Sequence, residues 1–295
     1  MVRILGYSEE YREQTLAYLT TSHPYLCHKS YDEVIAWLNT RVRYNWTNDV
    51  SITDFPFKYG VLIMDNDTVV GYLGLIYSYI NSNELPKVYV NFRSWSIDKK
   101  YGFYLYPAMT QIIETADIIG EFTPSSTIRE ICVKMYHFKP LDSSILKFYP
   151  TPTKLKCISY QEIYNPDKIT NPKTRNEYVD HLRYGIKCLE ITFNDGMLYI
   201  LFKRERARAK KILPAHLATI LQLSNIDLFH KHYKESIWIL QKSGNYFVNV
   251  EGRFLDDFII SNARNYRLYN NNKLAYFKSI PDNPLGLLYS EIIVR

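Results

Sequence analysis

The stretch from Lys87 to Lys139 constrains the fold most, because its expected elements follow one another in a fixed order. It predicts a strand at 88–97, a turn with one glycine at 98–105 and a helix at 105–116. A strand at 118–123 and a further helix that ends near Phe138 complete it. This order predicts an α/β (α+β) architecture with a mixed central sheet flanked by helices.

The residues before this stretch predict two helices and a hairpin. Residues 3–6 suit a strand, and Ser8 is placed to cap a helix over about 9–20. Ser30 is placed to cap a second helix. Apolar runs on either side of Asp65-Asn66-Asp67 predict a β-hairpin, because the connection is short and rich in turn-forming residues.

The predicted strand at 88–97 has two alternating sets of side chains, and one face is polar enough to line a cleft. The sets are Tyr89, Asn91, Arg93 and Trp95 on one side and Val90, Phe92, Ser94 and Ser96 on the other.

The second half repeats part of this order. Residues 150–185 are rich in Pro, Asn, Lys and Thr, which indicates a connection. A strand, the hairpin turn Asn194-Asp195-Gly196 and a return strand follow. Residues 212–221 suit either a strand or a helix, 227–241 predict a helix, and 287–294 predict a final strand. We therefore expect two tandem units, at 1–160 and 161–295.

Composition excludes several classes of protein. The chain has 295 residues, and 46% of them are apolar and 22% charged, which argues against disorder. The 27 tyrosines suit half-wet surfaces such as ligand clefts, although a biased coding composition explains them equally well. The net charge of +6 is spread thinly except in the basic run from Lys203 to Lys211. No nucleic-acid reader motif accompanies that run, so nucleic-acid binding is not expected.

The cysteines and the hydropathy pattern give the expected location. Cys27, Cys132, Cys157 and Cys188 lie far apart, without zinc-ligand spacing, so we expect reduced thiols and no metal site. Charged residues interrupt the first apolar run, and no apolar segment is long enough to span a bilayer. These features predict a cytoplasmic protein.

Residues 58–139 resemble the GNAT (GCN5-related N-acetyltransferase) superfamily. The resemblance lies in the hairpin, the strand Tyr89–Ile97, the Asp98–Leu105 turn and the Phe122-Thr123-Pro124-Ser125-Ser126 unit with its helix. It covers about a third of the chain by motif and about half by element order. It implies acyl-CoA as cosubstrate, no tightly bound cofactor and transfer of the acyl group to an amine.

The resemblance also implies where acyl-CoA is held. In such folds its pyrophosphate lies on backbone N–H groups at a helix N-terminus. Here Asp98, Tyr101 and Gly102 fit the family turn, the Arg before the glycine is absent, and Tyr104 stands near the place of a second glycine. The implied cofactor-binding residues are Trp95, Ser96, Ile97, Lys99, Lys100, Tyr101, Gly102, Phe103, Tyr104, Leu105, Ser125 and Ser126.

The catalytic groups depart further from the family. The tyrosine that protonates the leaving thiolate would stand at Val133, whereas Tyr136 lies almost one turn away and is the candidate acid. In the family the general base is often a carboxylate on or near the strand that corresponds to 88–97. This strand has no Asp or Glu, and Asn91 is the polar residue on it that we name as a catalytic candidate. His23 and His28 are candidate bases from the first inter-helix loop. Weaker carboxylate candidates are Asp49, Asp54 and Glu84.

Three functions fit these residues. The first is an N-acyltransferase acting on a small amine, most readily a dTDP- or UDP-linked amino sugar for surface polysaccharide synthesis. The second is a non-catalytic GNAT-like binding module, which the missing motif residues favour. The third is an aminoacyl or peptidyl transferase that uses tRNA, for which the run 203–211 would supply charge.

Overall fold

The computed structural model describes residues 1–23, 26–41, 55, 57–80, 87–142, 144–209, 213–262, 266–267, 273–278 and 288. They form two compact units. The first unit comprises Met1–Lys139 and the segment at 273–278, and the second comprises Pro140–Asn272 with Leu288. The chain thus passes into the second unit at Pro140 and returns to the first near its C-terminus. The expected division of the chain into two functional units, at 1–160 and 161–295, stays a prediction.

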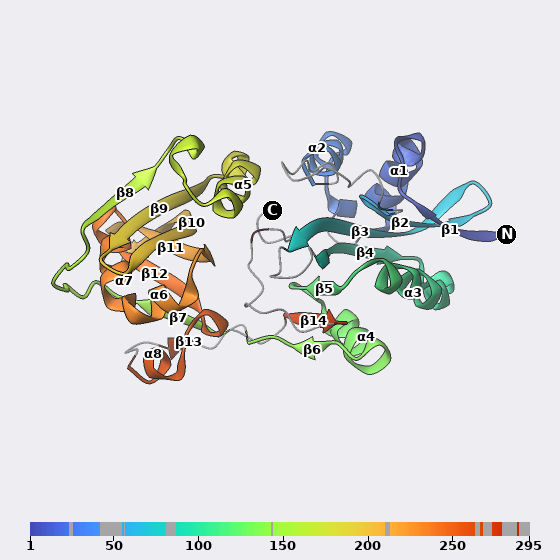
Figure 1. Ribbon diagram of the computed structural model, residues 1–295. Helices are drawn as coiled ribbons and strands as arrows, with labels where there is room; N and C mark the ends of the chain where they lie inside the picture. Colours follow the sequence, from blue (N-terminus) through green and yellow to red (C-terminus); the bar gives the residue numbers. More distant parts are fainter. Residues whose placement is uncertain are drawn as a thin grey trace. The chain divides into compact units, whose positions relative to one another are not determined.

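The first unit is built on one mixed sheet (Figure 1). Its described strands run in the order β1-β2-β3-β4-β5-β14-β6. Only the β4–β5 pair is parallel among the pairings given for it. Strand β14, from near the C-terminus, lies between β5 and β6, far from its neighbours in sequence. The strands are β1 (Val2–Gly6), β2 (Gly60–Asp65), β3 (Thr68–Ile80), β4 (Lys87–Ile97), β5 (Ile118–Glu121), β6 (Lys139–Pro140) and β14 (Leu274–Phe277).

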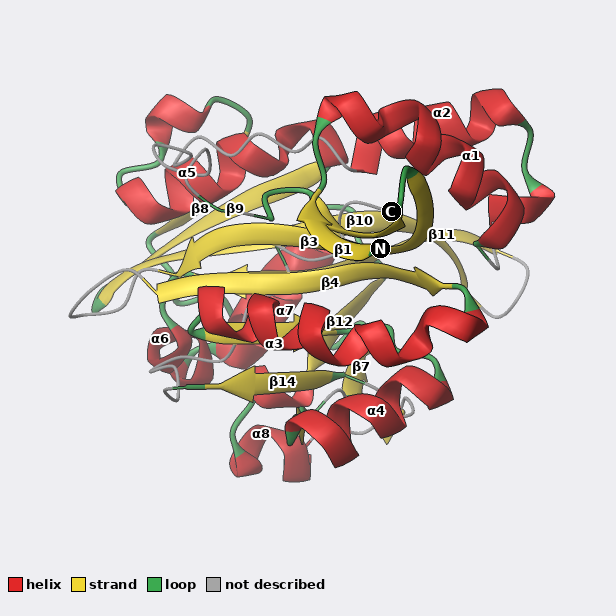
Figure 2. Cartoon of the chain, turned by 90° about the vertical axis from the view of Figure 1, so that its right-hand side faces the viewer, coloured by secondary structure: helices red, strands yellow, loops and turns green. Residues whose placement is uncertain are grey.

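Helices cover both faces of this sheet (Figure 2). Helices α1 and α2 pack on one face over Leu62, Met64 and Tyr72. Helices α3 and α4 pack on the other face over Val90 and Phe92. The helical segments are η1 (Glu9–Tyr11), α1 (Arg12–Ser22), η2 (Leu26–His28), α2 (Tyr31–Arg41), η4 (Lys99–Tyr104), α3 (Leu105–Thr115) and α4 (Ser126–Tyr136). No helix among the described residues is long and apolar enough to cross a membrane.

Local sequence signals explain most helix starts. Ser30 and Glu33 form a capping box, in which each side chain accepts the backbone N–H of the other residue at 3.3 and 2.9 Å. The hydroxyl of Ser125 accepts the N–H of Ile128, so Ser125 is the N-cap of α4. The prediction for Ser8 is wrong, because its hydroxyl donates to Glu10 and makes no cap bond.

The second unit is built on another mixed sheet. Its described strands run in the order β13-β7-β12-β11-β10-β9-β8, and only the β11–β12 pair is parallel. The hairpin at Asn194-Asp195-Gly196 is confirmed, because β9 ends at Phe193 and β10 begins at Gly196. The strands are β7 (Ile145–Phe148), β8 (Ser159–Ile163), β9 (Ile186–Phe193), β10 (Gly196–Ala209), β11 (Leu213–Leu223), β12 (Phe247–Glu251) and β13 (Tyr266–Arg267).

Three expectations for this half were wrong or incomplete. The segment 150–185 is more than a connection, because it contains β8 and α5, whose polar composition concealed them. The predicted helix at 227–241 is two helices, which meet at His232. For the basic run the sequence indicated charge alone, and the structure adds that Lys203–Ala209 lies in β10. The helical segments are η5 (Pro166–Lys168), α5 (Pro172–His181), η6 (Leu182–Tyr184), α6 (Ile226–Lys231), α7 (Tyr233–Lys242), η7 (Gly252–Phe254) and α8 (Asp257–Asn262).

The open alternative at 212–221 resolves as strand β11, since its central residues pair with both β10 and β12. The final strand predicted at 287–294 falls outside the described residues apart from Leu288, which lies in a turn.

The two sheets share one unusual backbone feature. The register between β3 and β4 shifts by one residue, which makes Arg93 a bulge residue of β4 without a partner in β3. The register between β10 and β11 shifts in the same way, which makes Leu221 a bulge residue of β11. The parallel pairing on the other side of the same strand ends at Asn91 in β4 and at Thr219 in β11. In each unit the bulge thus lies two residues beyond the last parallel pair. This agreement supports the interpretation of two tandem units of one fold.

Candidate functional site

The parallel strands of the first unit separate at their carboxyl ends. The last pair in register is Asn91 with Gly120, and the bulge at Arg93 bends β4 away from β5 beyond it. Ligands of α/β sheets commonly bind where neighbouring strands diverge at their carboxyl ends. The opening between β4 and β5 is therefore the candidate site of this unit.

A tryptophan and a glutamate meet across this opening. The indole Nε1–H of Trp95 in β4 donates to Oε2 of Glu121 in β5 at 2.8 Å. The other carboxylate oxygen of Glu121 accepts the N–H of Thr123 at 3.3 Å. Glu121 is only 4% exposed, and Trp95 packs on Phe92 with ring centroids 4.7 Å apart. A buried carboxylate beside the split strands is positioned to accept a proton.

Sequence reasoning missed Glu121, because its search for the base covered the 88–97 strand, two histidines and three other carboxylates, but not the end of the neighbouring strand at 118–123. A parallel neighbour presents its own end at the same edge of the sheet. A search of the residues that end both strands would have found this carboxylate.

Tyr136 supplies a hydroxyl on the same side of the sheet. It lies in α4, and its ring stacks on Tyr106 at the start of α3 with centroids 6.0 Å apart. Burial, together with Tyr106 and Cys132, raises the pKa of Tyr136 to about 12, so the phenol keeps its proton at neutral pH. Among the residues that the structure describes, nothing accepts or donates a hydrogen bond at this buried hydroxyl.

Cys132 connects Tyr136 to the carboxylate. Burial raises the pKa of its thiol, and the charge of Glu121 raises it further. Because Cys132 interacts electrostatically with both Glu121 and Tyr136, the two groups face one region of the protein, next to α4. The candidate acid and the carboxylate thus lie around one buried thiol, which is itself inert at neutral pH.

The turn expected to hold a pyrophosphate is a short 3-10 helix, η4. The Tyr101 N–H donates to the Asp98 carbonyl at 2.8 Å, and the Leu105 N–H donates to the carbonyl oxygens of Gly102 and Phe103. The Tyr101 hydroxyl donates to Asp65 at 2.5 Å and so fastens the turn to the β2–β3 hairpin. The expected backbone cradle at Tyr101–Leu105 therefore has two of its N–H groups already bonded.

The side chains of this turn divide into an inner and an outer set. Tyr101 and Leu105 are buried in the core beneath α3, and Tyr104 is partly buried. Lys99, Lys100, Gly102 and Phe103 are exposed, and a Cβ at Gly102 would meet no atom within 4 Å. The inner set fixes the turn, and the outer set, with its two lysines and exposed Phe103, is the part that an anionic cosubstrate would meet.

The polar residues predicted on β4 act mainly within the fold. Asn91 is fully buried and donates to the Tyr89 hydroxyl at 3.3 Å. Gly120 lies opposite, and a Cβ there would come within 2.8 Å of the Asn91 amide, so the pair excludes any larger residue. The Ser96 hydroxyl lies 3.2 Å from the Tyr18 hydroxyl and fastens β4 to α1. Ile97, which ends β4, packs partly buried against the core.

The remaining candidates are placed apart from one another. His23 ends α1, its Nδ1 accepts the Leu26 N–H at 3.3 Å, and burial lowers its pKa, so it stays neutral near pH 7. His28 is exposed in η2. Ser125 is committed to its capping bond, and Ser126 is exposed at the start of α4. Asp49, Asp54 and Glu84 lie outside the described residues.

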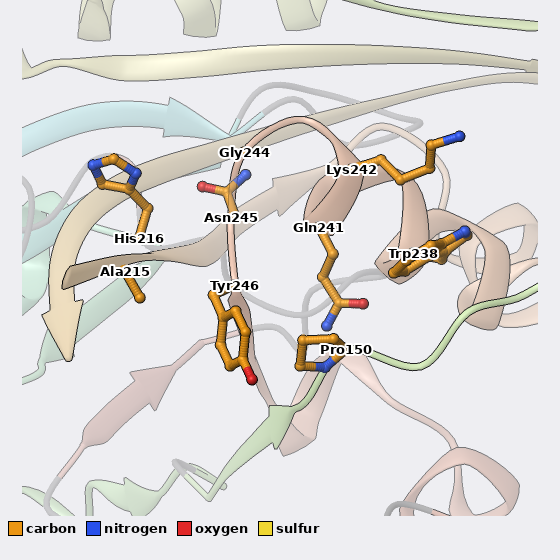
Figure 3. A pocket seen from close by; sticks show the side chains of 9 residues that line it. All are labelled: Pro150, Ala215, His216, Trp238, Gln241, Lys242, Gly244, Asn245 and Tyr246. Atoms are coloured by element: carbon orange, nitrogen blue, oxygen red, sulfur yellow. The ribbon is translucent and has the colours of Figure 1, made fainter. Parts of the chain in front are cut away.

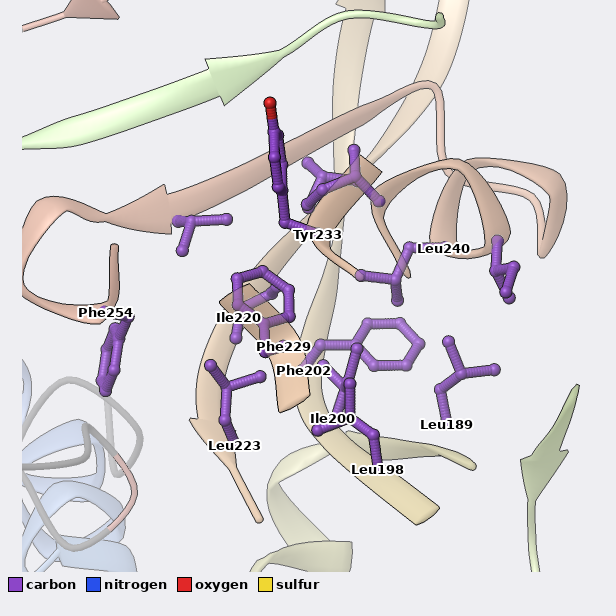
Figure 4. Packing of buried hydrophobic residues seen from close by; sticks show 14 of the residues in the cluster. Leu189, Leu198, Ile200, Phe202, Ile220, Leu223, Phe229, Tyr233, Leu240 and Phe254 are labelled. Carbon is purple, nitrogen blue, oxygen red and sulfur yellow. The ribbon is translucent and has the colours of Figure 1, made fainter. Parts of the chain in front are cut away.

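In the second unit, the matching opening is filled by apolar side chains. Leu221, the extra residue of the β11 bulge, is 1% exposed. Next to the bulge, Ile220 and Leu223 of β11 pack in one apolar cluster with Phe229 of α6 and with Phe254, which follows β12 (Figure 4). The carboxylate at the end of β12, Glu251, is held by Arg253 Nε at 2.7 Å, and both side chains are buried. No comparable opening beside a carboxylate is left there.

Comparisons with known proteins identify the fold. No protein-family profile matches the sequence, and no curated protein is similar to it. A GCN5-related N-acetyltransferase from Anabaena variabilis aligns with 93% of this chain and 72% of its own length, at 10% identity and a TM-score of 0.58. One from Kribbella flavida aligns with 94% and 72%, at 6% identity and a TM-score of 0.57.

A third structure agrees with these two. A conserved protein from Enterococcus faecalis, described as a probable N-acyltransferase, aligns with 94% of this chain and 72% of its own length, at 6% identity and a TM-score of 0.56. At such identities the similarity establishes the architecture, and it covers both units. The chain therefore has the fold of the GCN5-related N-acetyltransferases.

Proposed function

We propose that the protein is an acyl-CoA-dependent N-acyltransferase of the cytoplasm. The observation that carries the proposal is the buried Glu121 carboxylate, hydrogen-bonded to Trp95 where β4 and β5 separate. The fold shared with N-acetyltransferases gives the reaction class, and the chemistry of Glu121 and Tyr136 suits it.

The proposed reaction is direct attack of an amine on the thioester carbonyl. The C–N bond forms while Glu121 accepts a proton from the attacking nitrogen, directly or through one water molecule. The C–S bond then breaks, and the Tyr136 hydroxyl gives its proton to the departing thiolate. Solvent exchange returns the proton from Glu121 to Tyr136. Alignment of amine and thioester in the opening supplies much of the rate.

The first unit is the proposed active half. Trp95 lies four residues beyond the last parallel pair of β4 and bonds Glu121, whereas the second unit has the apolar Leu223 at the matching position of β11 and pairs Glu251 with Arg253.

The proposed acceptor is an amino sugar linked to a nucleotide, dTDP or UDP, as used in surface polysaccharide synthesis. Two exposed lysines on η4, Lys99 and Lys100, would meet a diphosphate, and the exposed rings of Phe103 and Tyr106 would stack with a base. The same two lysines would also bind the pyrophosphate of acyl-CoA, because both ligands carry a diphosphate.

The test uses the full-length protein with acetyl-CoA and longer acyl-CoAs, and with a panel of dTDP- and UDP-amino sugars. Release of free thiol is followed, and the product is identified by its mass. We expect release that depends on the acceptor and falls strongly in Glu121→Gln. Absence of release with every pair, together with no CoA binding by calorimetry, would sink the proposal.

One observation favours a rival, the non-catalytic module. The Trp95–Glu121 hydrogen bond joins β4 to β5 beyond their last register pair, and so closes part of the space that a thioester would enter. A binding module with a permanently closed opening would gain no thermal stability from CoA, whereas an enzyme that binds CoA would gain it by mass action. Trp95→Phe removes the N–H donor and keeps the ring, so it should strengthen CoA binding only if this bond has to open.

No comparable observation favours the transferase that uses tRNA. Within the basic run, Arg204 donates to Glu162 at 3.0 Å and to the Asn245 amide at 3.0 Å. This guanidinium is used within the second unit and is not presented to a phosphate backbone.

A further inference from the structure

The second unit contains a pocket that lies away from its β11–β12 opening. It has a volume of about 430 Å³, within the range of small-molecule sites. It lies beside the starts of β11 and β12, whereas the strands separate at their carboxyl ends. Its lining comes from four segments: Pro150, Ala215, His216, Trp238, Gln241, Lys242, Gly244, Asn245 and Tyr246.

The walls suit a flat ring. Trp238 from α7 is partly buried, and Tyr246 is 44% exposed, so both offer aromatic surface to a ligand. Figure 3 shows the amide of Gln241 between these two rings and next to Pro150. A planar ligand that enters here would lie against an aromatic ring and close to the buried amides of Gln241 and Asn245.

Gln241 makes the pocket selective. Its side chain is 8% exposed, and its Nε2 donates to the Phe148 carbonyl at 3.4 Å. Its Oε1 is buried and accepts no hydrogen bond from any residue that the structure describes. Because Gln241 lines the pocket and its buried Oε1 has no donor among the described residues, a ligand with an N–H or O–H group would satisfy this acceptor.

The surroundings hold this amide in place. At the pocket floor, Asn245 donates to the Leu240 carbonyl at 2.8 Å and accepts Arg204 Nε at 3.0 Å. The Glu235 carboxylate, from the same helix as Gln241, accepts the N–H groups of Lys156 and Cys157 and so fastens the segment after Pro150. A site whose polar groups are fixed before binding loses little entropy when the ligand enters.

The rim is basic. Lys242 and His216 are exposed there, and no lining residue is acidic. Lys242 forms no ion pair with the described part of the chain. Aromatic walls, one buried acceptor and a basic rim together match a nucleotide: a base against the rings, an amino or imino N–H at Gln241 and a phosphate at the rim.

We propose that this pocket is a nucleotide-binding site of the second unit, separate from the site between β4 and β5. Trp238 and Tyr246 hold the base, Gln241 Oε1 reads an N–H on its edge, and Lys242 with His216 binds the phosphate.

The test is calorimetric titration of the full-length protein with AMP, GMP, CMP and UMP. We expect at least one to bind at submillimolar concentration, and adenosine or the corresponding nucleoside to bind more weakly. Trp238→Ala should weaken that binding roughly ten- to a hundredfold, since base stacking is lost. Gln241→Met, similar in size but without the acceptor, should weaken it roughly tenfold.

Matched controls make the result specific. Lys242→Ala should weaken binding and reduce its salt dependence, whereas Lys234→Ala, on the same helix but outside the pocket, should change nothing. If AMP is the nucleotide bound, its N6,N6-dimethyl derivative, which has no exocyclic N–H, should bind as weakly to the wild type as AMP does to Gln241→Met.

Binding of CoA by the first unit is followed in every variant. We expect it to be unchanged, which separates this site from any nucleotide contact at the β4–β5 opening. The proposal is overturned if none of the four nucleotides binds at millimolar concentration. It is also overturned if Trp238→Ala and Gln241→Met, shown to be folded by their melting temperatures, bind as the wild type does.

Discussion

The strand ends of the two units share a backbone geometry but differ in what occupies it. In the first unit, β4 and β5 separate near Trp95 and Glu121. The neutral indole N–H of Trp95 donates a hydrogen bond to the Glu121 carboxylate. In the second unit, the parallel pairing of β11 and β12 ends in the same way, but Leu223 and its apolar neighbours pack there and Arg253 pairs with Glu251. The bulge creates an opening, and the side chains decide whether it can hold a ligand.

This difference has a physical cause. A bulge and a parallel crossover are set by backbone pairing, which tolerates many side chains. An opening lined by polar groups costs stability when it is empty, whereas one filled by Leu, Ile and Phe contributes burial free energy. We infer that the first unit keeps the opening for chemistry, and that the second has gained stability by filling it.

The strongest way to break this comparison is Glu121→Gln. The amide oxygen can still accept the Trp95 N–H, but the side chain can no longer take a proton. We expect the rate of thiol release to fall by about a hundred- to ten-thousandfold, and the melting temperature to fall as well, because the new NH2 group faces the Thr123 N–H. An unchanged rate would show that Glu121 is a structural residue.

Glu251→Gln is the matched change in the second unit. It leaves the buried Arg253 guanidinium without its carboxylate, which should lower the free energy of unfolding by about 3 kcal/mol. Denaturant unfolding measures this loss. Thiol release per folded molecule should not change, and a loss of turnover comparable to that of Glu121→Gln would contradict the assignment of activity to the first unit.

A pH series tests α5, which carries buried ionisable groups in the second unit. Burial raises the pKa of Glu177 from 4.5 to about 7, so the folded state keeps a proton that the unfolded state releases above pH 4.5. Its contribution to stability is complete below about pH 4.5 and is lost as the pH rises through 7.

Glu177→Gln removes this dependence. Relative to the wild type, the variant should be more stable by about 3 kcal/mol at pH 8 and nearly equal at pH 4.5. Urea unfolding at both pH values measures the difference. His181 responds in the opposite sense, because burial lowers its pKa to about 4 and its contribution is lost as the pH falls from 6.5 through 4. Equal stability differences at the two pH values would rule out the titration of Glu177 in this range.

The smallest expected effect is that of Tyr136→Phe. A thiolate is a good leaving group, so loss of the proton donor should slow turnover only about tenfold. The buried hydroxyl has no partner among the described residues, so its removal should raise the free energy of unfolding by about 1 kcal/mol. Slower turnover with higher stability is the expected signature, and lower stability would show that the hydroxyl has a partner.

Local sequence signals predicted much of the fold. The Ser30 cap and the Asn194-Asp195-Gly196 turn depend on contacts between residues close in sequence, and both are confirmed. For α4 the sequence left Ser125 and Ser126 open as the cap, and the structure shows Ser125. The α5 helix was missed because its buried face carries Glu177, Asp180 and His181 in place of an apolar stripe.

The candidate site was predicted less well. The sequence proposed candidate residues on β4 and the tyrosine of α4, which stay predictions, and in the structure Asn91 and Ser96 are occupied by packing and by bonds to Tyr89 and Tyr18. Glu121 could not be ranked, because its partner Trp95 is 26 residues away and the contact depends on the parallel pairing of β4 with β5.

The sequence by itself determined the local elements: where helices begin, where hairpins turn and which strands alternate. Periodicity and capping act over a few residues, so they can be read without the fold. Tertiary structure alone decided that β14 is inserted beside β5, that Glu121 faces Trp95, and that the amide of Gln241 is buried between two rings. These contacts join distant segments, and their free energy depends on burial and on strand register, which arise only once the sheets are assembled.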